Sequence, residues 1–483
     1  MKKVNLKIIG VFVLLVFILG SCEKWINTDI NNNPDAPINV PMSSILPAIE
    51  LNMAYVTVGG NDIARITAQW MQYIKGSARQ QLAQTNYVLR DGDMNNQWNS
   101  TYNTTFINLF KLMEKAKGAH AYYYGIAEVL MANSLGVTTD VWGDIPYSEA
   151  CKGSENLTPA YDTQQEIYTE IFRLLDDAIV NLSIVGVAPA VEGDLIYGGD
   201  PELWLKAAYA LKARYTLHLS KINPTTAFAD ALLPLPNAFS SSAEDLQFLF
   251  YNGQTESNPF WQFMDQRADI VMQKTFIDYL DTISEQNFGM QDPRLFEFAS
   301  ISGDPSQPYK GADWEDSGDD ASIPGGYYEG TYPAAPNSPV FFITFTELLF
   351  IKAECELNTN VPIDQVKTTL LEAVASSLNQ FNAFDQAYID ALGAYIAPLE
   401  KDPLYKVIMT QKYIALYYQA ETFVDWRRTN NIIGLQANPT SQAVQNVIPR
   451  RFPYSESEQS YNPANVPNIA DNWVPVWWDV FVQ

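Results

Sequence analysis

The stretch TFTELLFIKAEC, residues 344–355, carries a helical pattern that recurs over much of the chain. One face of a helix of 3.6 residues per turn would hold Thr344, Leu348, Ile351 and Cys355. The spacing therefore predicts a helix over 341–357. Because similar patterns lie on both sides of it, we expect a mainly α-helical fold, with helices over about half of the residues against a usual third.

The same periodicity extends outward from this helix in both directions. Toward the C-terminus it predicts helices at 363–378, 384–396 and 403–430. Toward the N-terminus, Asp200-Pro201 combines a capping acid with a proline in the first turn, and Asp162 or Thr163 can cap the helix before it. The earlier segments form two expected pairs, 43–58 with 62–76 and 94–117 with 120–135.

Residues 230–340 have a different composition, with crowded Pro, Gly, Ser, Asn and aromatic residues. Only 268–284 has a firm helical pattern there, and residues 431–483 are again rich in Pro and Asn. A long irregular insertion in a helical chain is usually functional. We therefore expect it to form a loop-rich subdomain beside the helices.

The N-terminus has the layout of a secretory signal. Basic residues precede an uncharged apolar run over 8–20, which is too short for a comfortable membrane span, and Leu19-Gly20-Ser21-Cys22 follows. Small residues before a cysteine resemble a bacterial lipobox, in which cleavage leaves an acylated Cys22. We predict a signal peptide over 1–21 and a lipidated tether over 22–41, so that the mature protein is anchored to a membrane without spanning it.

Charge and composition exclude several classes of function. Removal of residues 1–21 takes away three lysines and changes the formal net charge from −25 to −28, which argues against nucleic acid as a partner. Only two histidines are present, so a histidine-ligated metal site or a Ser-His or Cys-His catalytic pair is not expected. After lipidation, Cys151 and Cys355 remain, and the sequence leaves open whether they are paired.

Several landmarks in order resemble the SusD/RagB family of outer-membrane nutrient-binding lipoproteins, and its SusD-like 2 branch most. These landmarks are the lipobox at Cys22, the segment WGDIPY at 142–147, the helix at 345–354, the helix at 411–423 followed by DWRRT at 425–429, and the final WWD at 477–479. The resemblance implies one domain over 42–483, with tetratricopeptide-like stacked helix pairs and an irregular insertion at about 230–340. It also implies no catalytic activity and no cofactor. The protein would face the cell surface, capture oligosaccharides or oligopeptides, and act as the lid of a SusC-like TonB-dependent transporter.

The segment 95–102 is the best ligand candidate outside the insertion. Trp98 and Tyr102 are four residues apart and share a helix face, and Asn95 and Asn99 supply amides beside them. Aromatic rings edged by amides suit a sugar ring or a peptide. The alternative is that Trp98 packs into the helix stack, and the sequence does not decide between the two.

A second candidate region is the loop 309–332, where Trp314, Tyr327 and Tyr328 offer flat apolar surfaces. We predict that the ligand binds between this loop and the Trp98 helix. Five acids in this loop could bind Ca²⁺, form a solvated acidic loop, or hold a cationic or hydroxyl-rich ligand: Asp313, Glu315, Asp316, Asp319 and Asp320. Their spacing does not match the usual calcium loop.

The helix that ends in Asp425, Arg427 and Arg428 is expected to place a buried ion pair against another helix. Arginine bonds carboxylates in a two-pronged geometry, and Glu354 or Glu421 is the expected partner.

A competing function is a secreted lipoprotein that hydrolyses glycans or peptides. The absence of a phosphate loop, a nucleophile elbow or a zinc-protease motif weakens that alternative.

Overall fold

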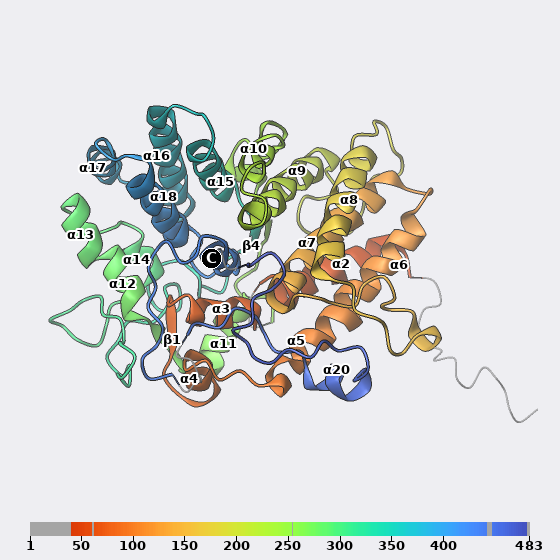
Figure 1. The fold of residues 1–483 in the computed structure, drawn as a ribbon, viewed down its shortest axis with the longest axis horizontal. Helices are drawn as coiled ribbons and strands as arrows, with labels where there is room; N and C mark the ends of the chain where they lie inside the picture. Colours follow the sequence, from red (N-terminus) through yellow and green to blue (C-terminus); the bar gives the residue numbers. More distant parts are fainter. Residues whose placement is uncertain (1–39, 60–61, 254, 442–446, 481–483) are drawn as a thin grey trace, which may run out of the picture. The chain divides into compact units, whose positions relative to one another are not determined.

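The computed structural model describes residues 40–59, 62–253, 255–441 and 447–480. The predicted signal peptide and Cys22 lie outside these residues, as does nearly all of the predicted tether. The described part is mainly helical, and consecutive helices pack against each other in pairs (Figure 1). This confirms the predicted fold class.

The N-terminal helices form one group. Helix α2 (Met42–Asn52) continues into a π-helical segment (Met53–Thr57), and α5 (Asn95–Ser100) continues through a second π-helical segment (Thr101–Phe106) into α6 (Ile107–Ala116). Helix α7 (Ala121–Trp142) packs on α6 and on α8 (Gln164–Leu182), which in turn packs on α9 (Pro201–His218). The predicted caps form, because Thr163 accepts from the Glu166 amide and Asp200 accepts from the Glu202 amide.

The C-terminal helices form a second group, seen at the upper left of Figure 1. Helix α15 (Phe345–Leu357) packs on α16 (Ile363–Gln380) and α18 (Lys401–Ala415), and α17 (Gln386–Ile396) packs on α16. Helix α19 (Glu421–Arg428) follows, and the short α20 (Glu456–Tyr461) lies in the otherwise irregular C-terminal segment. Helix α10 (Ala227–Leu232) connects the two groups by packing on both α9 and α15.

In the sequence, the predicted insertion lies between these two groups, and it contains short elements. They are β2 (Leu246–Phe248), α11 (Pro259–Gln266), β3 (Ile270–Met272), α12 (Lys274–Leu280), α13 (Thr282–Phe288) and α14 (Leu295–Phe298). Strand β3 pairs antiparallel with β1 (Ile74–Gly76), and β2 pairs with β4 (Val340–Ile343). Helices α3 (Ile63–Trp70) and α4 (Arg79–Thr85) flank β1.

Several predicted helix boundaries are wrong because of tertiary contacts. The helix expected over 341–357 begins only at Phe345, because 341–343 belong to strand β4, which pairs with β2. The helix expected over 62–76 ends at Trp70 and is followed by β1, and the helix expected over 268–284 begins instead with β3. A short apolar run fits a helix or a buried strand equally well, and only the pairing of two distant segments selects the strand. The helix expected over 403–430 breaks before α19, where Tyr418 has a φ of 63° and stacks on Phe260.

A network of buried charges joins the helix groups. Arg428 of α19 donates to both carboxylate oxygens of Glu354 in α15, and Asp425 bonds Arg428 and Lys412. The predicted ion pair is therefore confirmed, with Glu354 as the partner. Arg427 instead donates to the carbonyl oxygens of Asp140 and Arg450.

Glu421, the other expected partner, belongs to a second part of this network. It accepts from His218 at 2.9 Å and lies 3.5 Å from Arg214, which also pairs with Glu347. Burial alone would lower the pKa of His218, but Glu421 and Asp140 raise it to about 9, so the ring is charged at neutral pH. The pairs of Arg214 with Glu347 and of His218 with Glu421 link α9 to α15 and α19, and so hold the two groups together.

Candidate functional site

Two cavities with exposed aromatic residues border α11, a helix in the lower middle of Figure 1. Helix α11 begins at Asn258-Pro259, where the Asn258 side chain accepts from the Phe260 amide at 2.7 Å. This is the same signal, a capping residue followed by proline, that predicts α9. Helix α11 is not among the helices predicted from the sequence, although Asn258-Pro259 carries this signal.

A turn in the predicted loop aims two tyrosines at the first of these cavities. Gly326 has a φ of 94°, and a Cβ atom there would lie 2.3 Å from the Ala335 nitrogen, so only glycine fits. The Gly326 amide donates to Glu329, and the turn presents Tyr327 and Tyr328 at its tip. Their ring centroids are 4.7 Å apart, and Tyr328 is 78% exposed.

The remaining walls of this cavity come from α11, β3, the acidic part of the loop and Ser77. The cavity has a volume of about 530 Å³ and is lined by Tyr327, Tyr328, Asp265, Gln266, Arg267 and Asp319, among others. The Tyr327 hydroxyl donates to Asp265 at 3.4 Å, and burial together with that carboxylate raises the pKa of Tyr327. The site therefore combines two aromatic faces with acidic, amide and guanidinium groups. We call it the tyrosine cavity.

The acidic part of the loop is held against the sheet. Lys75 of β1 is buried and donates to the backbone carbonyl oxygens of Asp313 and Asp316, and burial lowers its pKa. Gly318 has a φ of 84° and lies against Val271 of β3. Trp314, which is half-buried, is carried on this segment but does not line the tyrosine cavity. Asp319 is the predicted acid that does.

The acids of this loop mainly bond groups of the loop itself. Asp313 accepts from the Trp314 amide, Asp316 from the Asp313 amide, Asp319 from Ser317 and Asp320 from Lys310, and Glu315 is exposed. Within the described residues, no group of three or more His, Cys, Asp or Glu side chains could hold a metal ion. Calcium binding at this loop stays a prediction that no observation supports.

The Trp98 group lies elsewhere. Trp98 is only 3% exposed, and its ring packs edge-on against Trp142 and Tyr454. Tyr102 contacts the Trp98 ring and donates to the Pro146 carbonyl. In this arrangement the Trp98 ring has almost no exposed face. This agrees with the alternative that Trp98 packs into the helix stack.

The two asparagines of this group hold the C-terminal segment. Asn95 accepts from the Ser457 amide at 2.9 Å, and Asn99 accepts from the Ser457 hydroxyl at 3.2 Å. Ser457 belongs to α20, so both amides position that helix. The structure thus brings Tyr327, Tyr328 and Asp319 together with α11, whereas Asn95, Trp98, Asn99 and Tyr102 contact α7 and the segment after 450.

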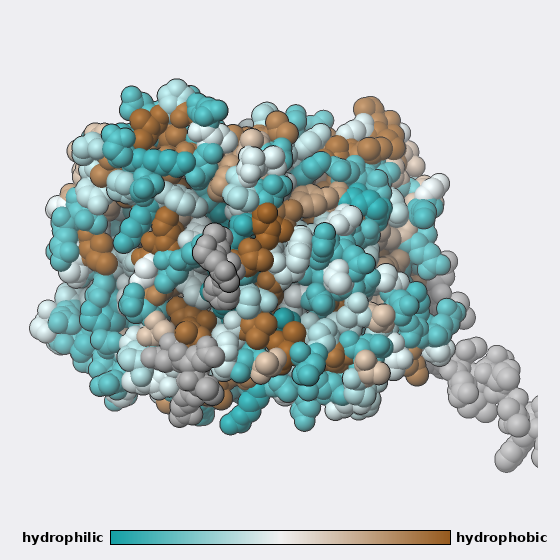
Figure 2. Space-filling model, viewed as in Figure 1, coloured by the Kyte–Doolittle hydropathy of each residue, from teal (hydrophilic) through white to brown (hydrophobic). Residues whose placement is uncertain are grey.

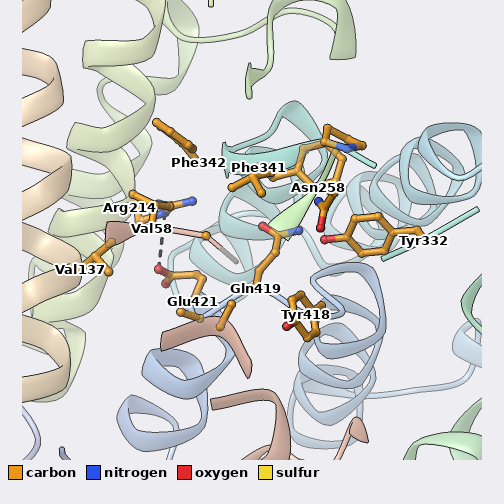
Figure 3. A pocket seen from close by; sticks show the side chains of 15 residues that line it. Val58, Val137, Arg214, Asn258, Tyr332, Phe341, Phe342, Tyr418, Gln419 and Glu421 are labelled. Atoms are coloured by element: carbon orange, nitrogen blue, oxygen red, sulfur yellow. Dashed lines mark ion pairs between the residues drawn. The ribbon is translucent and has the colours of Figure 1, made fainter. Parts of the chain in front are cut away.

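A small inner cavity is a poor candidate for ligand binding. Figure 3 shows Gln419 pointing between Asn258 and Tyr332, with Arg214 and Glu421 paired to one side. The volume is only about 50 Å³, which is room for a few water molecules at ~10–15 Å³ each and not for a sugar or a peptide.

Cys151 and Cys355 are both free thiols, so they form no disulfide.

The surface agrees with the strongly acidic composition. The face drawn in Figure 2 is mostly hydrophilic, with separate small apolar patches. None of the described helices combines the length and the apolar character that a membrane crossing requires.

Comparison with known proteins gives a consistent result. A crystal structure of a SusD/RagB family protein from Bacteroides thetaiotaomicron matches with a TM-score of 0.76 and 26% identity, covering 91% of this chain and 99% of that one. A chitin-binding protein matches with a TM-score of 0.76 and 23% identity, covering 91% and 100%. A chitin-binding SusD homolog from Flavobacterium johnsoniae matches with a TM-score of 0.73 and 20% identity, covering 91% and 97%.

No curated protein matches the chain. The family model that matches covers residues 34–455 and is described as starch-binding and associating with the outer membrane. Because this match extends over most of the chain and its fold is that of solved SusD/RagB proteins, the protein belongs to the SusD-like 2 family.

Proposed function

We propose that this protein is a surface-exposed binding lipoprotein that captures oligosaccharides at the tyrosine cavity and delivers them to a SusC-like TonB-dependent transporter. The observation that carries the proposal is the pair of half-buried Tyr327 and exposed Tyr328 beside a cavity edged by Asp265, Gln266 and Arg267. Sugar rings have flat apolar faces and a rim of hydroxyl groups, and this cavity offers partners for both.

A glycan is the favoured ligand over a peptide. The family is described as starch-binding, and two of the similar solved structures are described as chitin-binding. The residues by themselves would also suit an oligopeptide. Affinity for a single oligomer should be modest, on the order of micromolar, because the cavity is shallow and polar at its rim.

The proposed activity is binding without catalysis. The alternative of a hydrolase rests on carboxylates such as Asp265 and Asp319, which are abundant in an acidic chain and therefore carry little information. Incubation of the purified protein with maltoheptaose, chitohexaose and short peptides tests this. Catalytic release of shorter products would favour the hydrolase.

Tyr328→Ala is expected to weaken binding of the preferred oligosaccharide roughly tenfold, because a stacked ring contributes about 1–3 kcal/mol. Its thermal unfolding should be nearly unchanged, since the side chain is 78% exposed. Isothermal titration calorimetry measures the loss. Tyr461→Ala is the matched control, because Tyr461 is 80% exposed and lies outside the cavity. Equal affinities for both variants would rule out the tyrosine cavity as the site.

Cys22→Ser is expected to release the protein from the membrane fraction, because acyl chains on Cys22 would provide the anchor. Cell fractionation in high salt, followed by immunoblotting, gives the distribution. Cys151→Ser serves as the control and should remain with the membranes. A Cys22→Ser protein that still sediments with membranes would contradict lipidation at this residue.

A transporter partner is expected to co-purify with the wild-type protein from its native membrane. Gentle detergent extraction and affinity purification should recover a barrel subunit in a stable complex, whose interface would belong to the large class of about 2,000 Å² or more. Mass spectrometry identifies the partner. Recovery of the lipoprotein alone would count against this part of the proposal.

A further inference from the structure

A second cavity lies on the other side of α11. Its volume is about 1060 Å³, and it is lined by apolar side chains from three separate parts of the chain, such as Leu51, Tyr55, Leu195, Phe250 and Tyr251. Tyr251 is 66% exposed, and Leu51, Leu195 and Leu249 are also exposed. We call it the apolar cavity. Exposed apolar side chains around a hollow of this size mark a binding surface.

The aromatic walls of the apolar cavity are fixed in place. Tyr55 packs edge-on against Phe250 with 5.4 Å between ring centroids. Its hydroxyl donates to the Ser257 carbonyl at 2.9 Å and accepts from Gln262 of α11 at 2.9 Å. Because the hydroxyl is satisfied by the protein, the ring itself is what remains available for a ligand.

The two cavities share one lining residue at the C-terminal end of α11. Gln266 lines both of them, while Gln262, one turn earlier, lines only the apolar cavity and Asp265 lines only the tyrosine cavity. Thr104, which follows the helix that carries Trp98, also lines the apolar cavity. The π-helical segment that follows the Trp98 helix therefore borders the apolar cavity, whereas Trp98 itself does not line it.

The chemistry of the two cavities differs. The tyrosine cavity has Asp265, Arg267 and Asp319 beside its rings. The apolar cavity is lined mostly by aliphatic and aromatic side chains, and Asn52, Glu256 and Gln262 are among the polar residues on its wall. Each volume alone reaches or exceeds the range of about 300–1,000 Å³ that holds one small ligand. A ligand that uses both must be an oligomer, with polar units at one end and apolar substituents at the other.

We propose that the two cavities form one binding groove that holds several units of a single oligosaccharide across the end of α11, with N-acyl or similarly apolar substituents in the apolar cavity. This inference rests on the proposed glycan-binding function. Hydroxyl groups buried against Leu51, Leu195 and Leu249 would lack partners, which favours apolar substituents on that part of the wall. Two connected subsites raise affinity for long ligands because the second contact becomes intramolecular.

Chain length and two single variants test the groove. Wild-type protein is titrated with chitobiose and chitohexaose, and with maltose and maltoheptaose as unsubstituted counterparts. Chitohexaose is expected to bind at least roughly tenfold more tightly than chitobiose, with a smaller gain in the maltose series. Tyr251→Ala should remove most of the gain for chitohexaose and leave chitobiose unchanged, whereas Tyr328→Ala should weaken both. Tyr461→Ala is again the control for an exposed tyrosine.

The outcomes separate this inference from the proposed function. If Tyr328→Ala weakens binding but Tyr251→Ala leaves chitohexaose affinity unchanged, the groove is wrong and the tyrosine cavity stands. An equal gain with length in the maltose series would overturn the assignment of apolar substituents. If Tyr251→Ala instead reduces recovery of the transporter partner with normal glycan binding, the apolar cavity is a protein interface and the inference fails. Wild-type protein that binds none of the four probes would overturn both proposals.

Discussion

Trp98→Ala is expected to destabilise the protein by about 3–5 kcal/mol, the usual cost of truncating a buried tryptophan. The ring is enclosed by Trp142, Tyr454 and Tyr102, so its loss leaves a cavity where three elements meet. Urea denaturation of the variant and the wild type gives the difference. Glycan affinity, measured where the variant is folded, should be close to that of the wild type.

Trp314→Ala is the matched control, because Trp314 is half-buried on the acidic loop. Its cost in stability should stay below about 1 kcal/mol, as for most surface positions. The ligand interpretation of Trp98 makes the opposite prediction, with roughly tenfold weaker binding and an unchanged unfolding transition. That result would mean that the C-terminal segment moves away from Trp98 when a ligand binds.

Arg428→Ala is expected to cost about 3–5 kcal/mol, because it leaves buried carboxylates without their partner. The Arg428 side chain is 1% exposed and lies between Glu354 and Asp425, while Tyr405 also donates to Glu354. The ion pair connects α19 to α15, so its loss should weaken the packing of these two helices against each other. Chemical denaturation provides the measurement.

Arg173→Ala is the matched control on α8. Arg173 pairs with Glu170 and Asp177, but its side chain is 48% exposed, and exposed pairs typically contribute less than about 1 kcal/mol. The double variant Arg428→Met with Glu354→Met should recover part of the loss, since it removes both buried charges. Equal costs for Arg428→Ala and Arg173→Ala would mean that the buried network contributes little to stability.

Local signals in the sequence predicted the helices well wherever a helix depends on its own residues. Thr163 and Asp200 cap α8 and α9 as expected, because a cap requires only a side-chain oxygen and an amide two or three residues later. Strands β1 and β3 could not be predicted in the same way. Each has three residues, and their pairing joins segments about two hundred positions apart.

In the candidate site, too, some features follow from local sequence and others only from the packing of distant segments. The loop with Tyr327 and Tyr328 was recognisable from its aromatic and glycine content, and its position in an irregular insertion indicated function. The start of its partner α11 is marked by Asn258-Pro259, the same capping signal that predicts α9. That Gln266 lines both cavities has no signal in the sequence, because it depends on how distant segments pack around α11.

The sequence by itself determined the helical class, the family resemblance, the caps and the prediction of an Arg–Glu pair, because these depend on residue type and local spacing. The tertiary structure alone decided that Arg428 pairs with Glu354 while Glu421 pairs with Arg214 and His218. It also decided that Trp98 is buried, since the exposure of a ring depends on what packs against its other face. Here that face is covered by Trp142 and Tyr454, which lie far from Trp98 in the chain.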